Sequence, residues 1–323
     1  MSEDELLALC KEPKPKQRLH WTSEVYGFGA VLRKYGFFPG SLPLNIYLSH
    51  GLSVSEKPSP YELKNDAPFM LYFSPRLVKE YKKNSDKKCY CVISPNVFYR
   101  RYNKIAPDAN AKGSLAFLSH TTPMIENKMN LVNYILQLKA LPDEFHPISI
   151  CLHYHDVIKG VYKIFFDYGF EVVTVGNPYH ELFIERFYTL IRRFRYTTSN
   201  EIGSYTFYCS ELGIPFFLYG SEPELYNNGD PSIEAGEYKS YKSTEQYKKV
   251  KTLFSTIRKE VTPEQKRFVE EELGIYDSIG RWKMAYILYY AYFIFYCSKI
   301  KLKLLKRFGR GVEKSGRIFK TKI

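Results

Sequence analysis

Between Ser114 and Leu218 the chain alternates short apolar runs with segments of helical spacing, and this pattern restricts the folds open to it. The apolar runs have the length of buried strands, and the segments between them repeat apolar residues every three or four positions. Such an alternation is typical of a parallel, doubly wound sheet with helices on both faces. The predicted strands lie at 114–118, 148–152, 171–175, from Tyr196 onward and at 214–218, and the predicted helices at 128–140, 157–168, 181–193 and 202–212.

A similar, shorter alternation precedes this region. Strand patterns at 44–48, 68–73 and 90–94 enclose helical patterns at 25–35 and 75–83, and a cluster of turn-forming residues follows at 103–113. A chain of 323 residues suits two domains of about 100–200 residues each. The sequence therefore predicts an α/β fold of two Rossmann-like lobes, divided into a flexible arm (1–18), an N-terminal lobe (19–108), a C-terminal lobe (109–225), a polar helical crossover segment (226–280) and an aromatic helix with a basic tail (281–323).

The segment 196–220 has the pattern of a phosphate-binding turn. Ser199 and Asn200 are preferred N-cap residues for a helix predicted over 202–212, and Gly213 is placed to end that helix. A helix start presents unpaired N–H groups and a positive dipole end to an anion. Ser199, Asn200, Gly203 and Ser204 are therefore predicted to bind the phosphate of a donor: Gly203 would let a nucleotide approach the helix, and both serines would meet phosphate oxygens. The alternative is a well-capped core helix.

Polar residues follow several of the predicted strands, and the carboxyl ends of parallel strands share one edge of a sheet. We therefore expect the segments 119–121, 153–156, 176–177 and 199–204 to line one crevice. Ser119, His120 and Thr121 would donate hydrogen bonds to a phosphate, or else cap the following helix. His153, with His155 and Asp156, has the residue types of a metal site, but only two histidines align, so contact with a bound donor or local hydrogen bonding is the preferred interpretation and no metal site is predicted.

The positive charge of the chain is concentrated at its C-terminal end. Residues 299–323 contain ten Lys and Arg and one acid, which gives this segment +9 of the total +13. The remaining +4 is too little to indicate a nucleic-acid-binding body, so no nucleic acid is predicted as a partner. The charge of the tail instead suits an anionic membrane surface.

The run 284–297 holds fourteen uncharged residues, seven of them Tyr or Phe. A membrane span needs about 20 apolar residues, so the run favours a helix in the interface of an anionic membrane. The alternative is a core helix followed by a solvated tail. No secretory signal precedes residue 20, and the six cysteines lack a Cys-x-x-Cys pair, which indicates buried free thiols. These features predict a cytoplasmic protein attached peripherally to the inner face of the cell membrane.

Four segments resemble bacterial surface-polysaccharide proteins and, more broadly, inverting glycosyltransferases of the GT-B type. They are Gly27-Phe28-Gly29 with Leu32-Arg33-Lys34-Tyr35, Tyr47-Leu48-Ser49-His50-Gly51, Gly113 to Thr121, and Thr198 to Ser204. The resemblance covers residues 20–220. It implies a nucleotide-activated sugar in the C-terminal lobe, an acceptor on the N-terminal lobe, a GT-B-like arrangement of the two lobes and no cofactor beyond the nucleotide-sugar substrate. The absence of an Asp-x-Asp motif fits metal-independent transfer.

Inverting sugar transfer needs a base that takes the proton of the acceptor hydroxyl. His50 is the first candidate, because similar His-Gly strand ends in related transferases face the cleft; a plain loop histidine is the alternative. Glu24, beside a flexible turn, is the second candidate, or else an exposed acid at a helix start. Glu201 and Glu211 would contact a ribose, or would be ordinary helix carboxylates. Arg33 and Arg101 would neutralise phosphate, or lie on the surface.

The preferred hypothesis is a glycosyltransferase that moves a sugar from a nucleotide donor to a lipid-linked or growing surface polysaccharide, such as a capsule or O-antigen. Two alternatives share the architecture. One is a transferase of a polyol phosphate from a CDP-activated donor, and the other is a non-catalytic glycan-assembly protein. The nucleotide released distinguishes the two enzymes, and the lack of any stabilising nucleotide would favour the third.

Overall fold

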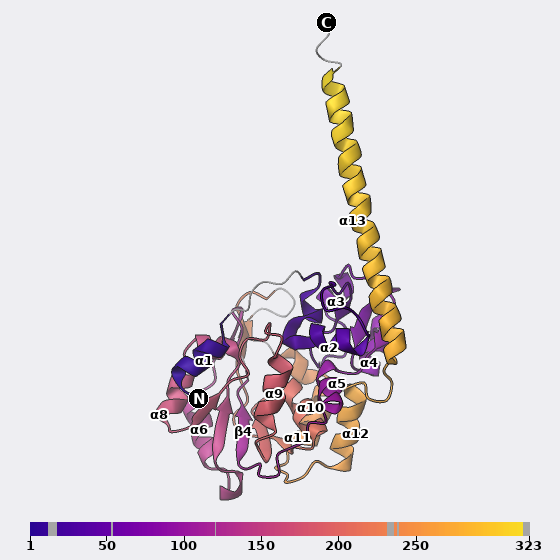
Figure 1. The fold of residues 1–323 in the computed structure, drawn as a ribbon. Helices are drawn as coiled ribbons and strands as arrows, with labels where there is room; N and C mark the ends of the chain where they lie inside the picture. The colour runs from indigo at the N-terminus through magenta and orange to yellow at the C-terminus, as the bar shows by residue number, and fades with distance from the viewer. Residues whose placement is uncertain (12–17, 53, 120, 231–235, 238, 319–323) are drawn as a thin grey trace.

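The computed structural model describes residues 1–11, 18–52, 54–119, 121–230, 236–237 and 239–318. The C-terminal lobe is built on a five-stranded parallel sheet with the order β7-β6-β4-β8-β9 (Figure 1). From β4 the chain runs outward on one side to β7, then returns to the other side for β8 and β9, which confirms the doubly wound topology. The strands are β4 (Ser114–Phe117), β6 (Ile148–Cys151), β7 (Glu171–Val173), β8 (Tyr196–Ser199) and β9 (Phe216–Leu218).

Helices cover both faces of this sheet, because successive residues of each buried strand point to opposite sides. Leu115 and Phe117 pack with α9 and α10, whereas Ala116 and Leu118 pack with α6, α7 and α8. The predicted helix at 157–168 is divided in two near Gly160, whose φ of +78° ends the first part. The helices are α6 (Leu131–Lys139), α7 (Tyr154–Ile158), α8 (Tyr162–Asp167), α9 (Phe183–Ile191) and α10 (Ser204–Leu212), with a 3₁₀ turn η3 at Asp143–Phe145.

The N-terminal lobe contains a smaller parallel sheet, β1-β2-β3, and its strands are shorter than the sequence predicts. Its inner side joins the same apolar core as α9 and α10 of the other lobe, so the two lobes are packed together. Two Rossmann-like lobes with parallel sheets are the arrangement of the GT-B fold. The elements are β1 (Tyr47–Leu48), β2 (Met70–Tyr72), β3 (Cys89–Cys91), α2 (Phe28–Tyr35), α3 (Pro60–Lys64), α4 (Pro75–Asn84), α5 (Pro95–Tyr102), η1 (Trp21–Ser23) and η2 (Val25–Gly27).

The prediction of a flexible arm at 1–18 is wrong for residues 1–11. Ser2 caps helix α1 (Glu3–Leu9) through a reciprocal pair of hydrogen bonds with Glu5. Leu6 is fully buried, and the amino group of Met1 donates to the carbonyl of Val172 beside the C-terminal lobe. The helix is therefore part of that lobe. Residues 12–17 lie outside the described part of the chain.

The crossover segment forms two helices and contributes to a small antiparallel sheet whose third strand, β5, comes from the C-terminal lobe. The sheet has the order β11-β10-β5 and was not predicted, because its short strands are polar and its members lie far apart in sequence. Helix α12 contacts α10 of one lobe and α4 of the other, so it bridges the two. The bounds are β5 (Ile125–Asn127), β10 (Leu225–Asn227), β11 (Gly236–Glu237), the 3₁₀ turn η4 (Ser240–Ser243), α11 (Glu245–Phe254) and α12 (Pro263–Glu272).

Helix α13 (Arg281–Ile318) leaves the body of the protein and projects away from it (Figure 1). The helix is much longer than the aromatic run that predicted it. Its first turns pack into the core through Met284, Ile287, Leu288 and Ala291. Among the described residues, no helix combines the length and the apolar character that crossing a bilayer would require. Five of the cysteines are buried free thiols, as predicted, and Cys297 on α13 is exposed.

Candidate functional site

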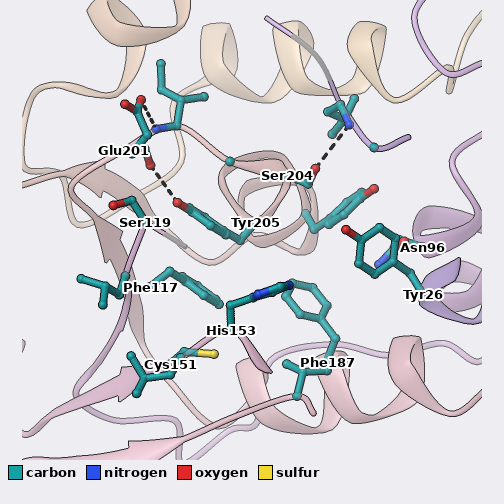
Figure 2. Close-up of a pocket in the computed structure, with 18 of the residues that line it drawn as sticks. Tyr26, Asn96, Phe117, Ser119, Cys151, His153, Phe187, Glu201, Ser204 and Tyr205 are labelled. Atoms are coloured by element: carbon teal, nitrogen blue, oxygen red, sulfur yellow. Dashed lines mark hydrogen bonds between the residues drawn. The ribbon is translucent and has the colours of Figure 1, made fainter. Parts of the chain in front are cut away.

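A cavity of about 410 Å³ lies between the two lobes. Its floor is formed where β4 and β6 end, at Phe117 and Cys151, which is where a doubly wound sheet binds its ligands (Figure 2). The N-terminal lobe supplies the opposite wall. The cavity is lined by residues that include Tyr26, Gly51, Leu52 and Asn96 from the N-terminal lobe and Phe117, Ser119, His153, Phe187, Glu201, Gly203, Ser204 and Tyr205 from the C-terminal lobe.

The start of α10 opens onto this cavity. The helix begins at Ser204 and not at the predicted 202, because Gly203, in an extended conformation, is its N-cap. Gly203, Ser204 and Tyr205 line the cavity, so the positive end of the helix dipole lies at its wall. The N–H of Gly203 donates to Thr206 Oγ1 and the N–H of Thr206 donates to the carbonyl of Gly203, so an anion here would be met by the N–H groups of Ser204 and Tyr205. Gly213 ends the helix in the left-handed conformation, as predicted.

Ser204 also marks the point where the lobes meet. Its Oγ accepts a hydrogen bond from the N–H of Leu52, at 3.3 Å, in the loop after β1. Gly51 has φ +73°, and a Cβ on it would lie 3.0 Å from the same Oγ. A glycine is thus required by both the backbone conformation and the close approach. The contact brings two separately predicted stretches, 50–51 and 203–204, into one place.

Tyr205 forms an aromatic wall of the cavity. Its ring stacks on Phe117 with centroids 4.5 Å apart and planes within 1° of parallel. Its hydroxyl donates to the carbonyl of Glu201 at 3.0 Å and shares a hydrogen bond with Ser199 Oγ. Burial raises the pKa of Tyr205 far above its usual value, so the hydroxyl stays protonated.

Ser199 and Asn200 do not line the cavity, although the sequence assigned both to phosphate. Ser199 Oγ accepts the N–H of Glu201 and meets Tyr205, which leaves it fully buried. Asn200 accepts the N–H of Ser119 at 3.3 Å and donates to the carbonyl of Ser221 at 3.0 Å. Both side chains therefore hold the turn after β8 against the end of β4.

Of the three residues predicted after β4, only Ser119 is described at the cavity. Its Oγ accepts a hydrogen bond from Asn127 at 2.8 Å. Thr121 instead donates its hydroxyl to Asp156 at 2.7 Å, outside the cavity. His120 lies outside the described residues.

His153 lines the cavity where β6 ends and α7 begins. The neighbouring Asp156 does not line the cavity and is 1% exposed. Its burial raises the pKa of this carboxyl to about 6, against the lowering effect of the hydrogen bonds from Thr121. Among the described residues there is no group of three His, Cys, Asp or Glu side chains placed to hold a metal ion.

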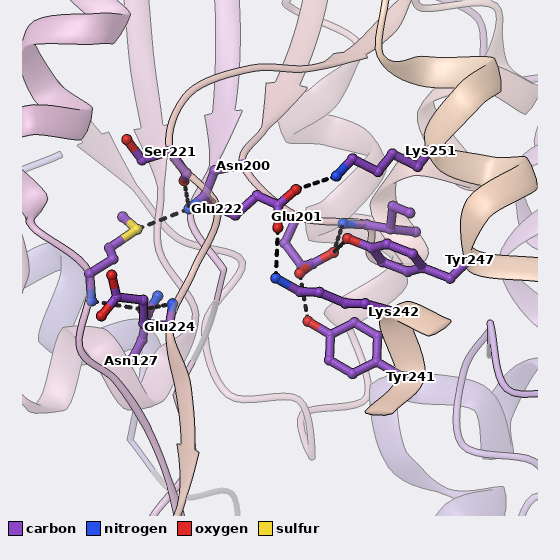
Figure 3. A network of polar contacts seen from close by, with 12 residues as sticks. Asn127, Asn200, Glu201, Ser221, Glu222, Glu224, Tyr241, Lys242, Tyr247 and Lys251 are labelled. Atoms are coloured by element: carbon purple, nitrogen blue, oxygen red, sulfur yellow. Dashed lines mark hydrogen bonds and ion pairs between the residues drawn. The ribbon is translucent and has the colours of Figure 1, made fainter. Parts of the chain in front are cut away.

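Glu201 lies at the edge of the cavity, but its carboxylate is held by the crossover segment (Figure 3). Tyr241 donates to it at 2.7 Å and Tyr247 at 3.2 Å. Beside this group, Glu222 pairs with Lys242 and Lys251. These contacts hold the crossover segment against the turn that leads into α10. A ribose hydroxyl, as predicted for Glu201, would have to bind a carboxylate that already accepts hydrogen bonds from two tyrosines.

Glu211 lies at the far end of α10, away from the cavity, so the ribose contact predicted for it is wrong. Its side chain is 1% exposed and pairs with Arg100 and Arg101 on α5. Arg100 Nε donates at 2.7 Å. The group locks α10 to the N-terminal lobe, and Arg101, predicted as a phosphate ligand, is engaged in it and with Glu270.

Glu24 does not reach the cavity either, which contradicts its candidacy as a base. Both of its carboxylate oxygens accept hydrogen bonds from Arg33, at 2.6 and 2.9 Å. Arg33 also donates to the carbonyl of Leu42. This half-buried bidentate pair joins the segment before α2 to the helix and, through Leu42, to the loop after it. Glu24 and Arg33 are therefore engaged with each other and not with a ligand.

His50 is exposed and is not among the residues that line the cavity, but it packs against Tyr26, which does line it. The two rings stack with centroids 5.3 Å apart, and the hydroxyl of Tyr26 lies 3.3 Å from His50 Nε2. Trp21 packs on the other side of the imidazole at 4.8 Å. Tyr26 itself faces the cavity with a φ of 59°, a conformation that is rare for a residue with a side chain and is concentrated at functional sites.

Several of the wall residues were missed by the sequence reasoning, among them Phe117, Tyr205, Tyr26 and Asn96. Tyr26 gives no signal beyond its place before Gly27. Asn96, at the start of α5, is 3% exposed and lines the cavity, and its Oδ1 accepts no hydrogen bond from the described residues. A buried amide without a partner is costly, so a ligand donor at this point would be favourable. No Lys or Arg is among the described lining residues, so an anion would be met by backbone amides.

Comparison with known proteins adds little. No family profile matches the sequence, and no curated protein does so either. Among solved structures, the chain is similar to the wall teichoic acid polymerase TagF, with 17% sequence identity and a TM-score of 0.33. The match covers 73% of this chain and 57% of TagF, so the chain spans little more than half the length of that protein. At this level of similarity the function has to be argued from the residues of the chain itself.

Proposed function

We propose that the protein is a glycosyltransferase that binds a nucleotide-activated sugar in the cavity between its lobes. The observation that carries the proposal is the juxtaposition of the start of α10 with the loop that follows β1. The first provides an anion-binding helix end at the cavity. The second holds His50 beside Tyr26, a residue that lines the cavity. Both walls of a two-substrate site are then present within one cavity.

The donor phosphate is best accommodated at the first N–H groups of α10, beside Ser204 Oγ. The flat aromatic surface of Tyr205 and Phe117 suits the stacking of a base or the apolar face of a sugar. Asn96, on the opposite wall, supplies a carbonyl oxygen to a hydroxyl or amino group of the ligand.

In the proposed reaction the acceptor hydroxyl enters from the rim, and His50 takes its proton as the new bond to the sugar carbon forms. The bond from that carbon to the phosphate oxygen breaks, and its electron pair leaves with the nucleotide. The helix dipole stabilises the negative charge that develops on this oxygen. Attack from the face opposite the leaving group inverts the sugar carbon, and no metal is assigned a role.

The acceptor that we propose is a lipid-linked or growing surface glycan at the inner face of the cell membrane. A flat, partly aromatic rim fits a sugar acceptor, and the size of the cavity leaves the rest of a long glycan outside. The donor that releases its nucleotide identifies the base and the sugar.

The test is an assay of released nucleotide with UDP-, GDP- and CMP-sugars and with CDP-polyols, in the presence of membrane glycolipid extract. Release of UDP, GDP or CMP from a sugar donor, lost in His50→Gln, supports the proposal. Release of CMP from a CDP-polyol alone would replace it with polyol-phosphate transfer. If no donor is turned over and no nucleotide raises the melting temperature, the protein is not a transferase.

A further inference from the structure

The outer face of α13 carries a continuous stripe of exposed aromatic and apolar side chains. The outer stripe consists of Trp282, Tyr286, Tyr289, Phe293, Tyr296 and Ile300. The spacing alternates between four and three residues, which keeps all six on one side of a helix. Trp282 is 81% exposed and Phe293 is 61% exposed, so large apolar areas face outward. A contiguous exposed patch of this kind marks an interaction surface.

The opposite face of the helix fixes the stripe in position. Met284, Ile287, Leu288 and Ala291 are buried against the N-terminal lobe. Asn45 donates to the carbonyl of Ala291 at 2.9 Å, which joins the helix backbone to the loop before β1. The first half of α13 is therefore held rigidly on the body, with its aromatic side turned outward.

The same spacing continues beyond the stripe with basic residues. After Ile300, the positions at alternating steps of three and four are Lys303, Arg307, Arg310, Lys314 and Arg317. The backbone is helical through Ile318, so the aromatic and basic positions belong to one helix of about 57 Å at 1.5 Å per residue.

The order of aromatic and then basic positions along α13 distinguishes between two partners for this surface, a second copy of the helix and an anionic lipid surface. A heptad-like stripe suits a second copy of the helix, but a parallel pair would then oppose like charges at every position after Ile300. An anionic lipid surface attracts the same charges. Tyr and Trp side chains are also the residues that favour the boundary between apolar chains and polar headgroups, because each has a ring and a hydrogen-bonding atom.

We propose that α13 lies along an anionic phospholipid surface, with the outer stripe at the headgroup boundary and the basic continuation on the lipid phosphates. The inference concerns attachment and does not depend on the proposed transferase activity. A helix of this kind binds by buried apolar area together with electrostatic attraction, so both halves should be needed.

The full chain is mixed with vesicles of phosphatidylcholine, with or without about one third phosphatidylglycerol, and pelleted. We expect binding to the anionic vesicles at about 100 mM NaCl and at least a tenfold loss at about 500 mM NaCl, because salt screens exposed charges. Equal binding to neutral and anionic vesicles, or no binding to either, would overturn the proposal.

Two sets of variants separate the halves of the helix. Trp282→Ser with Tyr286→Ser and Phe293→Ser is compared with Tyr61→Ser, Ile158→Ser and Tyr276→Ser, which are similarly exposed elsewhere. Lys303→Glu with Arg307→Glu and Arg310→Glu is compared with Lys79→Glu, Lys82→Glu and Lys163→Glu, which are exposed lysines on other helices. Each α13 set should lower vesicle binding at least tenfold, and its control should not. All variants should keep the melting temperature of their controls.

Light scattering in the absence of lipid tests the competing occupant. We expect no dimer whose formation depends on the outer stripe. A stable dimer that the serine variants dissociate would assign the stripe to a second copy and overturn the proposal, as would serine variants that bind anionic vesicles as tightly as the unmodified protein.

Discussion

The N–H of Leu52 and the Oγ of Ser204 are joined by a hydrogen bond of 3.3 Å that links the loop after β1 to the first residue of α10. These residues belong to different lobes and are 152 positions apart in the sequence. Their contact sets how close the rim, with His50, lies to the helix start. The geometry of transfer would depend on this single approach, and Gly51 permits it.

Gly51→Ala should therefore lower transfer as well as stability. The left-handed φ is strained for alanine by about 1 kcal/mol, and the added Cβ would crowd Ser204 Oγ. Gly213→Ala is the matched control, because Gly213 also has a positive φ but has no atom within 4 Å of the added Cβ. Urea denaturation should show a similar loss for both variants, while only Gly51→Ala should reduce nucleotide binding. Equal binding by the two variants would contradict the assigned role of the contact.

His50→Gln should reduce kcat by about 100-fold, the usual scale for removing a general base, with little change in donor binding. Tyr26→Phe keeps the ring but removes the hydroxyl next to His50, so a smaller decrease is expected. The control is His146→Gln, because His146 lies before β6 in the C-terminal lobe, where its ring bonds to the carbonyl of Leu141. Steady-state kinetics with the identified donor measures kcat for the three variants. An unchanged kcat in His50→Gln would exclude His50 as the base.

Glu211→Gln should destabilise the protein by about 3 kcal/mol, because it leaves two arginines without their buried partner. Glu245→Gln breaks an exposed pair with Lys248 and should cost less than about 1 kcal/mol. Urea denaturation of both variants measures the difference. A small effect in Glu211→Gln would mean that the lobes are held together mainly by their shared apolar core.

These ion pairs show what the sequence could and could not predict. The order of strands and helices followed from apolar periodicity, since each buried strand needs a run of apolar residues. The partners of Glu24 and Glu211 did not follow from it. Arg33 is nine positions from Glu24, and Arg100 is 111 positions from Glu211. Only the folded chain brings these charges together.

Asp156 should give the stability a measurable pH dependence. Its pKa is raised to about 6 by burial, so the folded state holds a proton that the unfolded chain releases near pH 4. This contribution is fully present below about pH 4 and is lost as pH rises to about 6, at on the order of 1 kcal/mol per pH unit. Asp156→Asn should remove that slope from the urea midpoints measured between these values. An unchanged slope would show that another group is responsible.

The candidate site was also only partly predictable. Ser119, His153, Gly203 and Ser204 line the cavity, as the rule for strand ends in a doubly wound sheet suggests. Ser199 bonds a backbone group of its own turn, as short polar side chains often do, whereas Asn200 bonds the backbone of Ser119 and Ser221 in other segments. Tyr26 and Asn96 come from the other lobe, and no local pattern shows which of its side chains will face the cleft.

The central claim is that the start of α10 binds the phosphate of a nucleotide. Calorimetric titration of UDP, GDP, CDP and CMP into the unmodified protein, Ser204→Glu and Thr252→Glu tests it most directly. A carboxylate is tolerated at the first position of a helix but repels a phosphate there, whereas Thr252 lies on the exposed side of α11. We expect at least one nucleotide to bind the unmodified protein and Thr252→Glu alike, with at least tenfold weaker binding to Ser204→Glu. Equal affinity in all three proteins, or no binding in any, would contradict the account.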